Sequence, residues 1–342
     1  MPEVKPLLEV RGVQRHFRIR AAAGHPAGTL RAVDGVSLTL GAGETLGVVG
    51  ESGCGKSTLA RLIVGLLEPT AGSIHLDGGD IWEAGAAGRE RRRQFQMVFQ
   101  NPAGSMNPRR TLGASVAEPL QARGVRRTDE EVARMLALVG LNPKMALRMP
   151  HQMSGGQQQR ASIARALIAN PKLVVHDEAV ASLDISLQAQ ILNLLVDLQA
   201  RLGTSYVFIS HDLAAVQAIS HRVMVMYLGE VVETAAASVF AAQPRHPYSI
   251  ALRNATLLPD PVVERGRSGL VLRGDVPSPM NPPSGCRFRT RCPLATERCA
   301  ATAPPLQDSG GGHLVACHVP DAAERLARGD AAAGGTPAQV FA

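Results

Sequence analysis

Aromatic residues and lysines are scarce in this sequence. Aromatic side chains make up 3% of its 342 residues, which argues against the stacking platforms on which many single-strand binders hold bases. Of the 36 basic residues, only Lys5, Lys56, Lys144 and Lys172 are lysines. The arginines are scattered apart from a cluster at 89–93. We therefore interpret the net charge of +7 as a solvated surface and expect no nucleic-acid partner.

Long apolar runs and a charged leader are also lacking. The longest apolar runs, such as 223–228, are too short to span a bilayer, and no charged segment followed by an apolar core opens the chain. We therefore expect a cytoplasmic protein that reaches a membrane only through a partner. The five cysteines are Cys54 and four residues between 286 and 317. In a cytosolic chain such a cluster favours a metal over disulfides.

Residues 50–57 fit the P-loop pattern G-x-x-x-x-G-K-[ST], between an apolar strand and a helix. Glycines let the backbone N–H groups of such a loop face a phosphate chain, and the following helix adds its positive end. Lys56 is expected on the β- and γ-phosphates, and Ser57 on Mg²⁺. The predicted nucleotide contacts here are Gly50, Ser52, Gly53, Cys54, Gly55, Lys56, Ser57 and Thr58.

Strand and helix patterns alternate around this loop. We expect strands at 7–19, 32–40, 73–76, 94–100, 173–175 and 206–209. Helices are expected at 56–67, within 112–147, from 154 to Asn170-Pro171, and at 187–202. This alternation predicts an α/β domain with a parallel-sheet core.

Three later segments carry residues that ATPase chemistry needs. The strand 173–175 leads into Asp177, expected on Mg²⁺, and Glu178, expected to orient or deprotonate the attacking water. Ser154, Gly155, Gly156 and Gln157 open a helix and form a second anion site, or only a helix cap. Gln100 is expected to sense Mg²⁺ or the attacking water, and His211 is expected to contact the γ-phosphate. A capped turn for Gln100 and a core histidine for His211 are the alternatives.

Together these segments resemble an ABC-type ATPase subunit over about residues 7–245. The P-loop, Gln100, 154–157, Asp177-Glu178, 182–184 and His211 match its Walker A, Q-loop, signature, Walker B, D-loop and switch histidine. The resemblance implies ATP and Mg²⁺, with Gln100 and Asp184 near the nucleotide. It also implies head-to-tail dimers in which one subunit's signature closes on its partner's ATP. Phe17 matches the aromatic residue that stacks on adenine, with a core strand position as its alternative.

The resemblance narrows to the oligopeptide and dipeptide importers, and to their F-type ATPase subunit. Residues 96–109, 188–195, His246-Pro247-Tyr248 and 117–120 carry it. It implies two permeases, contacted through residues 100–115, a D-type ATPase partner and an extracytoplasmic solute-binding protein. The subunit would lie on the cytoplasmic face of the bacterial inner membrane. Some positions depart from the family pattern. His176 replaces a small residue, Ala179 a proline and Met153 a leucine or phenylalanine, and Ala181-Ser182 reverses the common Ser-Ala.

Cys286, Cys292, Cys299 and Cys317 are separated by five, six and seventeen residues. Four thiolates hold either Zn²⁺ or an iron–sulfur cluster, and unligated structural thiols are the third alternative. The paired C-x-x-C knuckles of zinc ribbons are absent. The resemblance implies a [4Fe–4S] cluster, because the importer family's C-terminal extension has this cysteine pattern.

We expect three regions. Residues 1–255 would form the ATPase domain, comprising a parallel-sheet core, an antiparallel β subdomain and an α-helical subdomain at about 101–155. Residues 256–320 would form a small Pro- and Cys-rich extension, and 321–342 a disordered tail. The favoured function is ATP-driven import of peptides or similar small solutes. The alternatives are an ABC ATPase acting on nucleic acid or ribosomes, and a metal- or redox-sensing nucleotide-binding protein.

Overall fold

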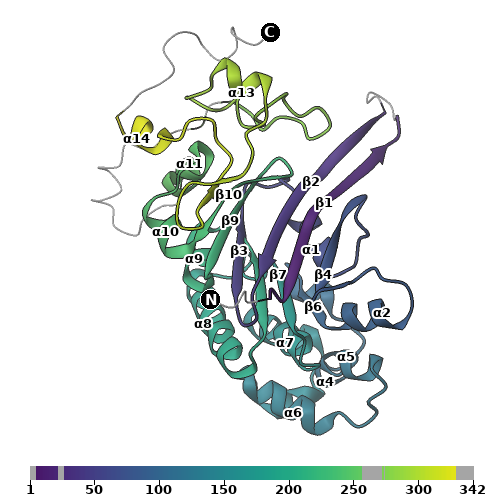
Figure 1. Ribbon diagram of the computed structural model, residues 1–342. Coiled ribbons are helices and arrows are strands. Elements are labelled where there is room, and N and C mark those ends of the chain that lie inside the picture. Colours follow the sequence, from purple (N-terminus) through teal and green to yellow (C-terminus); the bar gives the residue numbers. More distant parts are fainter. Residues whose placement is uncertain (1–4, 22–26, 256–271, 273, 329–342) are drawn as a thin grey trace.

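A computed structural model describes residues 5–21, 27–255, 272 and 274–328. Its main sheet has eight strands in the order β11-β12-β10-β9-β3-β8-β7-β6 (Figure 1). The bounds of these strands are β3 Thr45–Val49, β6 Phe95–Val98, β7 Leu173–Asp177, β8 Ser205–Ile209, β9 Arg222–Tyr227, β10 Glu230–Ala236, β11 Gln307–Asp308 and β12 Leu314–Val315.

The five strands from β9 to β6 run parallel. Every residue of β3, β7 and β8 is buried, as expected for parallel strands covered on both faces. Apolar side chains of α1 pack against one face, and those of α7, α8 and α9 against the other. These helices are α1 Lys56–Ile63, α7 Gly155–Leu167, α8 Ile185–Leu202 and α9 Leu213–Ile219. The predicted α/β core is confirmed.

A second, antiparallel sheet has the order β2-β1-β4-β5. Its strands are β1 Leu8–Ile19, β2 Gly28–Leu40, β4 Ala71–Leu76 and β5 Gly79–Asp80. Helix α2 (Ala86–Arg93) then leads into β6. The amide of Asp34 in β2 donates to the carbonyl of Gly229 at 2.9 Å. This bond ties the second sheet to the β9–β10 turn beside the P-loop.

Residues 102–152 form short helices at one end of the molecule, opposite the C-terminal extension (Figure 1). They are α3 Pro102–Ser105, α4 Leu112–Val116, α5 Glu118–Ala122, α6 Asp129–Leu138, η1 Pro143–Leu147 and η2 Pro150–Gln152. Gly124 and Gly140 adopt positive φ angles, and Pro143 begins η1. These residues interrupt the helical pattern of 112–147.

The C-terminal region continues the main sheet. After α10 Ala237–Ala242 and α11 Pro247–Ala255 come α13 Glu297–Ala301, β11, β12 and α14 Ala322–Ala327. Strand β12 pairs with β10. Helix α14 lies within the predicted tail, and Ala322 is buried against Leu294 and Val319, so the start of this segment is folded. The predicted boundary near 255 and the rest of the tail fall next to or within 256–271 and 329–342, outside the described residues.

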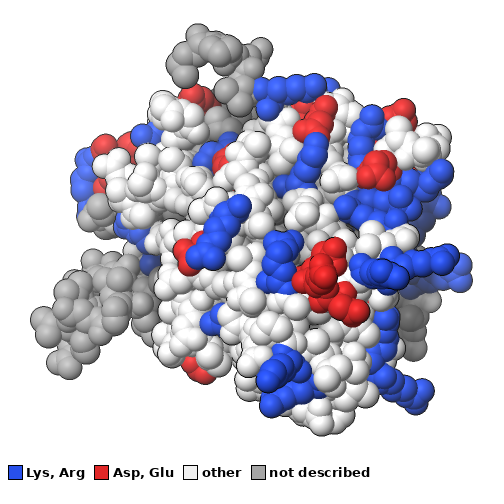
Figure 2. Space-filling view, turned by 90° about the horizontal axis from the view of Figure 1, so that it is seen from below, with Lys and Arg blue, Asp and Glu red and all other residues white. Residues whose placement is uncertain are grey.

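Basic side chains are distributed in separate groups over the face seen in Figure 2, with acidic side chains between several of them. No helix among the described residues has both the length and the apolar character needed to cross a membrane.

Candidate nucleotide site

Most of the predicted nucleotide and catalytic residues lie at the carboxyl ends of four parallel strands. The P-loop follows β3, Gln100 follows β6, Asp177 ends β7 and Glu178 follows it, and His211 follows β8. The loop after β3 approaches neighbouring backbone so closely that glycine is required at two positions. Gly50 has a φ of 155°, and a Cβ there would lie 2.3 Å from the carbonyl oxygen of Met226. Gly55 has a φ of 107°, and its Cβ would lie 2.1 Å from the carbonyl oxygen of Ala32. A side chain at either position would deform the loop.

Lys56 lies beneath this loop. Its Nζ donates to the carbonyl oxygens of Gly50 at 2.7 Å and Glu51 at 2.9 Å, and only 4% of the residue is exposed. The Cys54 thiol is buried, and this burial raises its pKa. Ser52 and Gly53 are exposed at the loop tip. An ammonium group within a curled loop at the start of α1 is an arrangement suited to phosphates.

Two Mg²⁺ ligands predicted from the sequence meet in space. Ser57 Oγ donates to Asp177 Oδ1 at 3.0 Å, although the residues are far apart in the chain. Burial raises the pKa of Asp177, the Ser57 hydrogen bond lowers it, and the neighbouring Glu178 raises it further. A hydroxyl and a buried carboxylate are oxygen ligands that Mg²⁺ accepts, so these residues fit the cation.

Two predicted catalytic side chains, Gln100 and His211, approach the same carboxylate oxygen of a third, Glu178. Gln100 Nε2 donates to Glu178 Oε2 at 3.0 Å, and His211 Nδ1 lies 3.6 Å from the same oxygen. Each of the three follows a different strand.

Glu178 also has an unusual backbone conformation, with a φ of 51°. Its amide donates to the carbonyl of Ile209 at 2.9 Å, which fixes this conformation. A non-glycine residue in the left-handed region costs about 1–2 kcal/mol, and such strain clusters at functional sites.

The signature segment 154–157 forms a capping box. Ser154 Oγ accepts from the Gln157 amide at 3.4 Å, and Gln157 Oε1 accepts from the Ser154 amide at 3.1 Å. Ser154 and Gly155 are exposed, and a Cβ at Gly155 would meet open space, whereas Gly156 packs near Leu187. The start of α7 is therefore accessible to a ligand or a second subunit.

Two other predicted residues have local partners. Asp184 caps α8 by accepting from the Leu187 amide at 2.9 Å, next to Ile185, which is 88% exposed. Phe17 lies on β1, with the Arg15 guanidinium 4.7 Å from its ring centroid. These contacts leave the nucleotide roles of Asp184 and Phe17 as predictions.

Sequence reasoning missed two contacts to Glu51 in the P-loop. The Glu51 amide donates to the Tyr248 hydroxyl at 2.8 Å, and its carboxylate accepts from Arg291 at 2.8 Å. The sequence indicates Tyr248 only through a family resemblance. No local pattern identifies a partner of Glu51 that lies 240 residues away.

The four C-terminal cysteines lie in one small region. The Cys286 amide donates to the Cys299 carbonyl at 2.8 Å. The pKa of Cys286 is raised to about 11, chiefly by burial, and the nearby Cys299 and Cys317 contribute to the rise. Burial also raises the pKa values of the Cys292 and Cys317 thiols. No group of three or more His, Cys, Asp or Glu among the described residues is placed to hold a metal ion, so the expected cluster has no ready site here.

Residues 33–181 match the ABC transporter family, and residues 232–299 match the oligopeptide/dipeptide transporter C-terminal region. The chain is 51% identical over 322 residues to a probable peptide ABC transporter ATP-binding protein, y4tS, of Sinorhizobium fredii, covering 92% of this chain and 90% of that protein. It is 49% identical to the oligopeptide transport ATP-binding protein OppF of Salmonella typhimurium, covering 92% and 96% respectively.

The chain also has a fold similar to that of a solved structure. That structure is a dimeric, post-hydrolysis state of the ATP-binding cassette MJ0796 bound to ADP and Pi. The similarity has a TM-score of 0.59 at 28% identity and covers 67% of this chain and 98% of that one. From its sequence relatives and its fold, the chain belongs to the ATP-binding subunits of the oligopeptide and dipeptide ABC transporters.

Proposed function

We propose that this protein is the ATP-hydrolysing subunit that powers import of peptides across a membrane through partner permeases. The single observation that carries the chemistry is the meeting of Gln100, Glu178 and His211 next to the Ser57–Asp177 pair. The names of the relatives support a peptide as the transported substrate, because they describe ATP-binding proteins of peptide or oligopeptide transport.

The proposed chemistry assigns one task to each group. Lys56 and the start of α1 hold the phosphates, and Ser57 and Asp177 hold Mg²⁺, which neutralises phosphate charge when bound. Glu178 orients the attacking water and accepts its proton, and Gln100 and His211 hold the Glu178 carboxylate in position. The remaining P-loop residues and Phe17 bind the nucleotide.

The proposed site is complete only between two subunits. The exposed Ser154 and Gly155 would close on the partner's nucleotide, with Gln157 and Asp184 at the same interface. We propose a D-type ATPase as that partner, in a complex with two permeases on the cytoplasmic face and a solute-binding protein beyond them. The dimeric state of the ATP-binding cassette MJ0796 supports a paired arrangement.

Replacing Glu178 by Gln tests this function. The variant removes the proton acceptor but keeps the shape of the side chain, so turnover in the assembled transporter should fall about 10²–10⁴-fold while ATP binding persists. Glu131→Gln, at an exposed position on α6, is the matched control and should retain full turnover. Unchanged turnover in Glu178→Gln would refute the assignment.

We separately propose that the C-terminal extension binds a [4Fe–4S] cluster. The proximity of the four cysteines and the family's C-terminal match support it. It requires the thiols to deprotonate and reorganise, because they are not arranged as ligands among the described residues. Anaerobically purified protein should then contain about four irons and acid-labile sulfide per chain. Stoichiometric zinc, or thiols without metal, would overturn the proposal.

A further inference from the structure

Glu51, a residue of the phosphate-binding loop, is held by side chains from outside the predicted nucleotide residues. Its carboxylate accepts from Arg291 Nη1 at 2.8 Å, and the Arg291 side chain is only 9% exposed. Its amide donates to the hydroxyl of Tyr248 at 2.8 Å. The loop therefore has two anchors, one from the C-terminal extension and one from α11.

The position of Arg291 is set by a block of packed aromatic rings. Phe288 contacts Tyr227 and Tyr248 with ring centroids 5.2 and 5.4 Å apart, and the Arg291 amide donates to the Phe288 carbonyl at 3.0 Å. The guanidinium lies 6.0 Å from the Tyr227 ring centroid. Because Arg291 directly precedes Cys292, the fold of the cysteine region determines where this charge lies.

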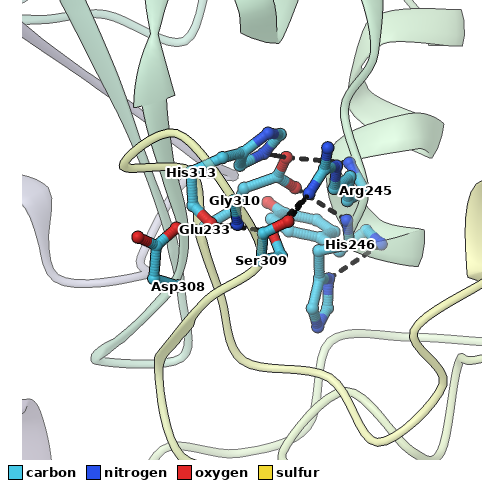
Figure 3. A network of polar contacts seen from close by, with 8 residues as sticks. Glu233, Arg245, His246, Asp308, Ser309, Gly310 and His313 are labelled. Carbon is cyan, nitrogen blue, oxygen red and sulfur yellow. Dashed lines mark hydrogen bonds and ion pairs between the residues drawn. The ribbon is translucent and has the colours of Figure 1, made fainter.

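The extension makes a second contact just before α11, the helix that carries Tyr248; Figure 3 shows Glu233, Arg245, His246 and His313 of this contact. The buried Glu233 carboxylate accepts from the Arg245 and His246 amides at 2.8 and 2.7 Å, just before α11. His313, between β11 and β12, lies 2.7 Å from Glu233 through its Nε2. Glu233 of β10 thus holds the start of α11, and the extension contacts Glu233 through His313. Helix α11 carries the Tyr248 hydroxyl that accepts from the Glu51 amide.

The charge of Glu51 gives these contacts a functional consequence. A carboxylate in a phosphate-binding loop repels a nucleotide polyphosphate unless a cation neutralises it. Lys56 bonds to the Glu51 carbonyl oxygen rather than to its carboxylate. Among the described residues, Arg291 is the cation that pairs with the carboxylate itself.

We propose that Arg291 is a positioning residue for the nucleotide site. It neutralises Glu51 and holds the phosphate-binding loop, so the C-terminal extension sets nucleotide affinity. The inference rests on the proposed nucleotide site. It predicts an effect on binding rather than on the chemical step. Among the described residues, Arg291 forms its ion pair with Glu51, whereas Gln100 and His211 lie against Glu178.

Arg291→Gln in the full chain is the central test. We expect the Kd for MgADP and the KM for ATP to rise about 3–10-fold, with kcat changed less than twofold. The double variant Glu51→Gln/Arg291→Gln should return both constants to within twofold of the wild type, because no carboxylate is left unpaired. Arg291→Lys should give an intermediate value. Arg298→Gln, an exposed position in the same region, is the matched control.

The outcomes separate this inference from the proposed function. If the wild-type chain binds no MgADP, the nucleotide site itself is wrong. If it binds MgADP and Arg291→Gln binds equally well, the inference is overturned and the proposed function stands. A loss in Arg291→Gln that Glu51→Gln does not rescue, with a matching fall in thermal stability, would show a structural role only and would also overturn the inference.

Discussion

The ATPase core and the C-terminal extension are stabilised in different ways. The core buries whole strands, including every residue of β7 and β8, between helices on both faces. The extension has a small apolar cluster of its own, centred on Leu294, Val319 and Ala322. It is joined to the core by charged contacts from Arg287, Arg291 and His313. A region with so small a core depends on its neighbour for stability. In return, Arg291 of the extension pairs with Glu51 in the phosphate-binding loop of the core.

The largest effect is expected where the two regions share an apolar contact. Phe288 is 1% exposed and packs against Tyr227, Tyr248 and His246. Phe288→Ala should lower the free energy of unfolding by about 3–5 kcal/mol in urea titrations. Leu147→Ala, at a position that is 83% exposed, should change it by less than about 0.5 kcal/mol. Equal, small effects would mean that the extension folds independently of the core.

A smaller effect is expected at the buried polar contact. Glu233 is fully buried and its two carboxylate oxygens accept from two amides and approach His313. In Glu233→Gln one acceptor oxygen becomes an NH₂ donor that faces another donor, so stability should fall by about 1–3 kcal/mol. Glu297→Gln, an exposed change in α13, is the control. A neutral result for Glu233→Gln would show that the polar contacts add little to the attachment of the extension.

The smallest effect concerns acid sensitivity within the core. His176 is fully buried, neither ring nitrogen has a hydrogen-bond partner, and burial lowers its pKa from 6.5 to about 3. The unfolded chain therefore binds this proton first, so stability is lost as the pH falls below about 6.5 towards 3. Between pH 7 and 5.5 the wild type should lose about 1 kcal/mol more than His176→Val. Matching pH profiles would refute this. His246, also buried with a pKa lowered to about 4, keeps part of the dependence in both proteins.

The sequence predicted the core best where a short pattern has one structural meaning. The P-loop, the capping box at Ser154 and Gln157, and the acidic end of β7 are local patterns, and the structure has the expected helix or strand at each. The proximity of Gln100, Glu178 and His211 could also be predicted, because each of them follows a strand of the parallel sheet. Loops after parallel strands share one edge of the sheet.

What the sequence did not reveal depends on distant partners. The sequence does not predict strands β9 and β10, although 223–228 is an apolar run, because their place in the sheet depends on pairing with β3 and β12. The predicted tail includes α14, whose Ala322 is buried by residues from elsewhere in the extension. The Glu51–Arg291 pair has no local signal. The cysteine spacing predicted a metal site, whereas no three His, Cys, Asp or Glu side chains among the described residues are grouped so that they could bind a metal ion.

The Glu51–Arg291 pair also bears on how the protein is made. Arg291 follows Glu51 by 240 residues, so at ordinary synthesis rates it leaves the ribosome about 12–48 s later. During that interval the nascent phosphate-binding loop carries an uncompensated carboxylate. If Arg291 sets nucleotide affinity as proposed, full affinity is reached only near the end of translation, and a truncated chain that lacks the extension would compete poorly with complete subunits for ATP.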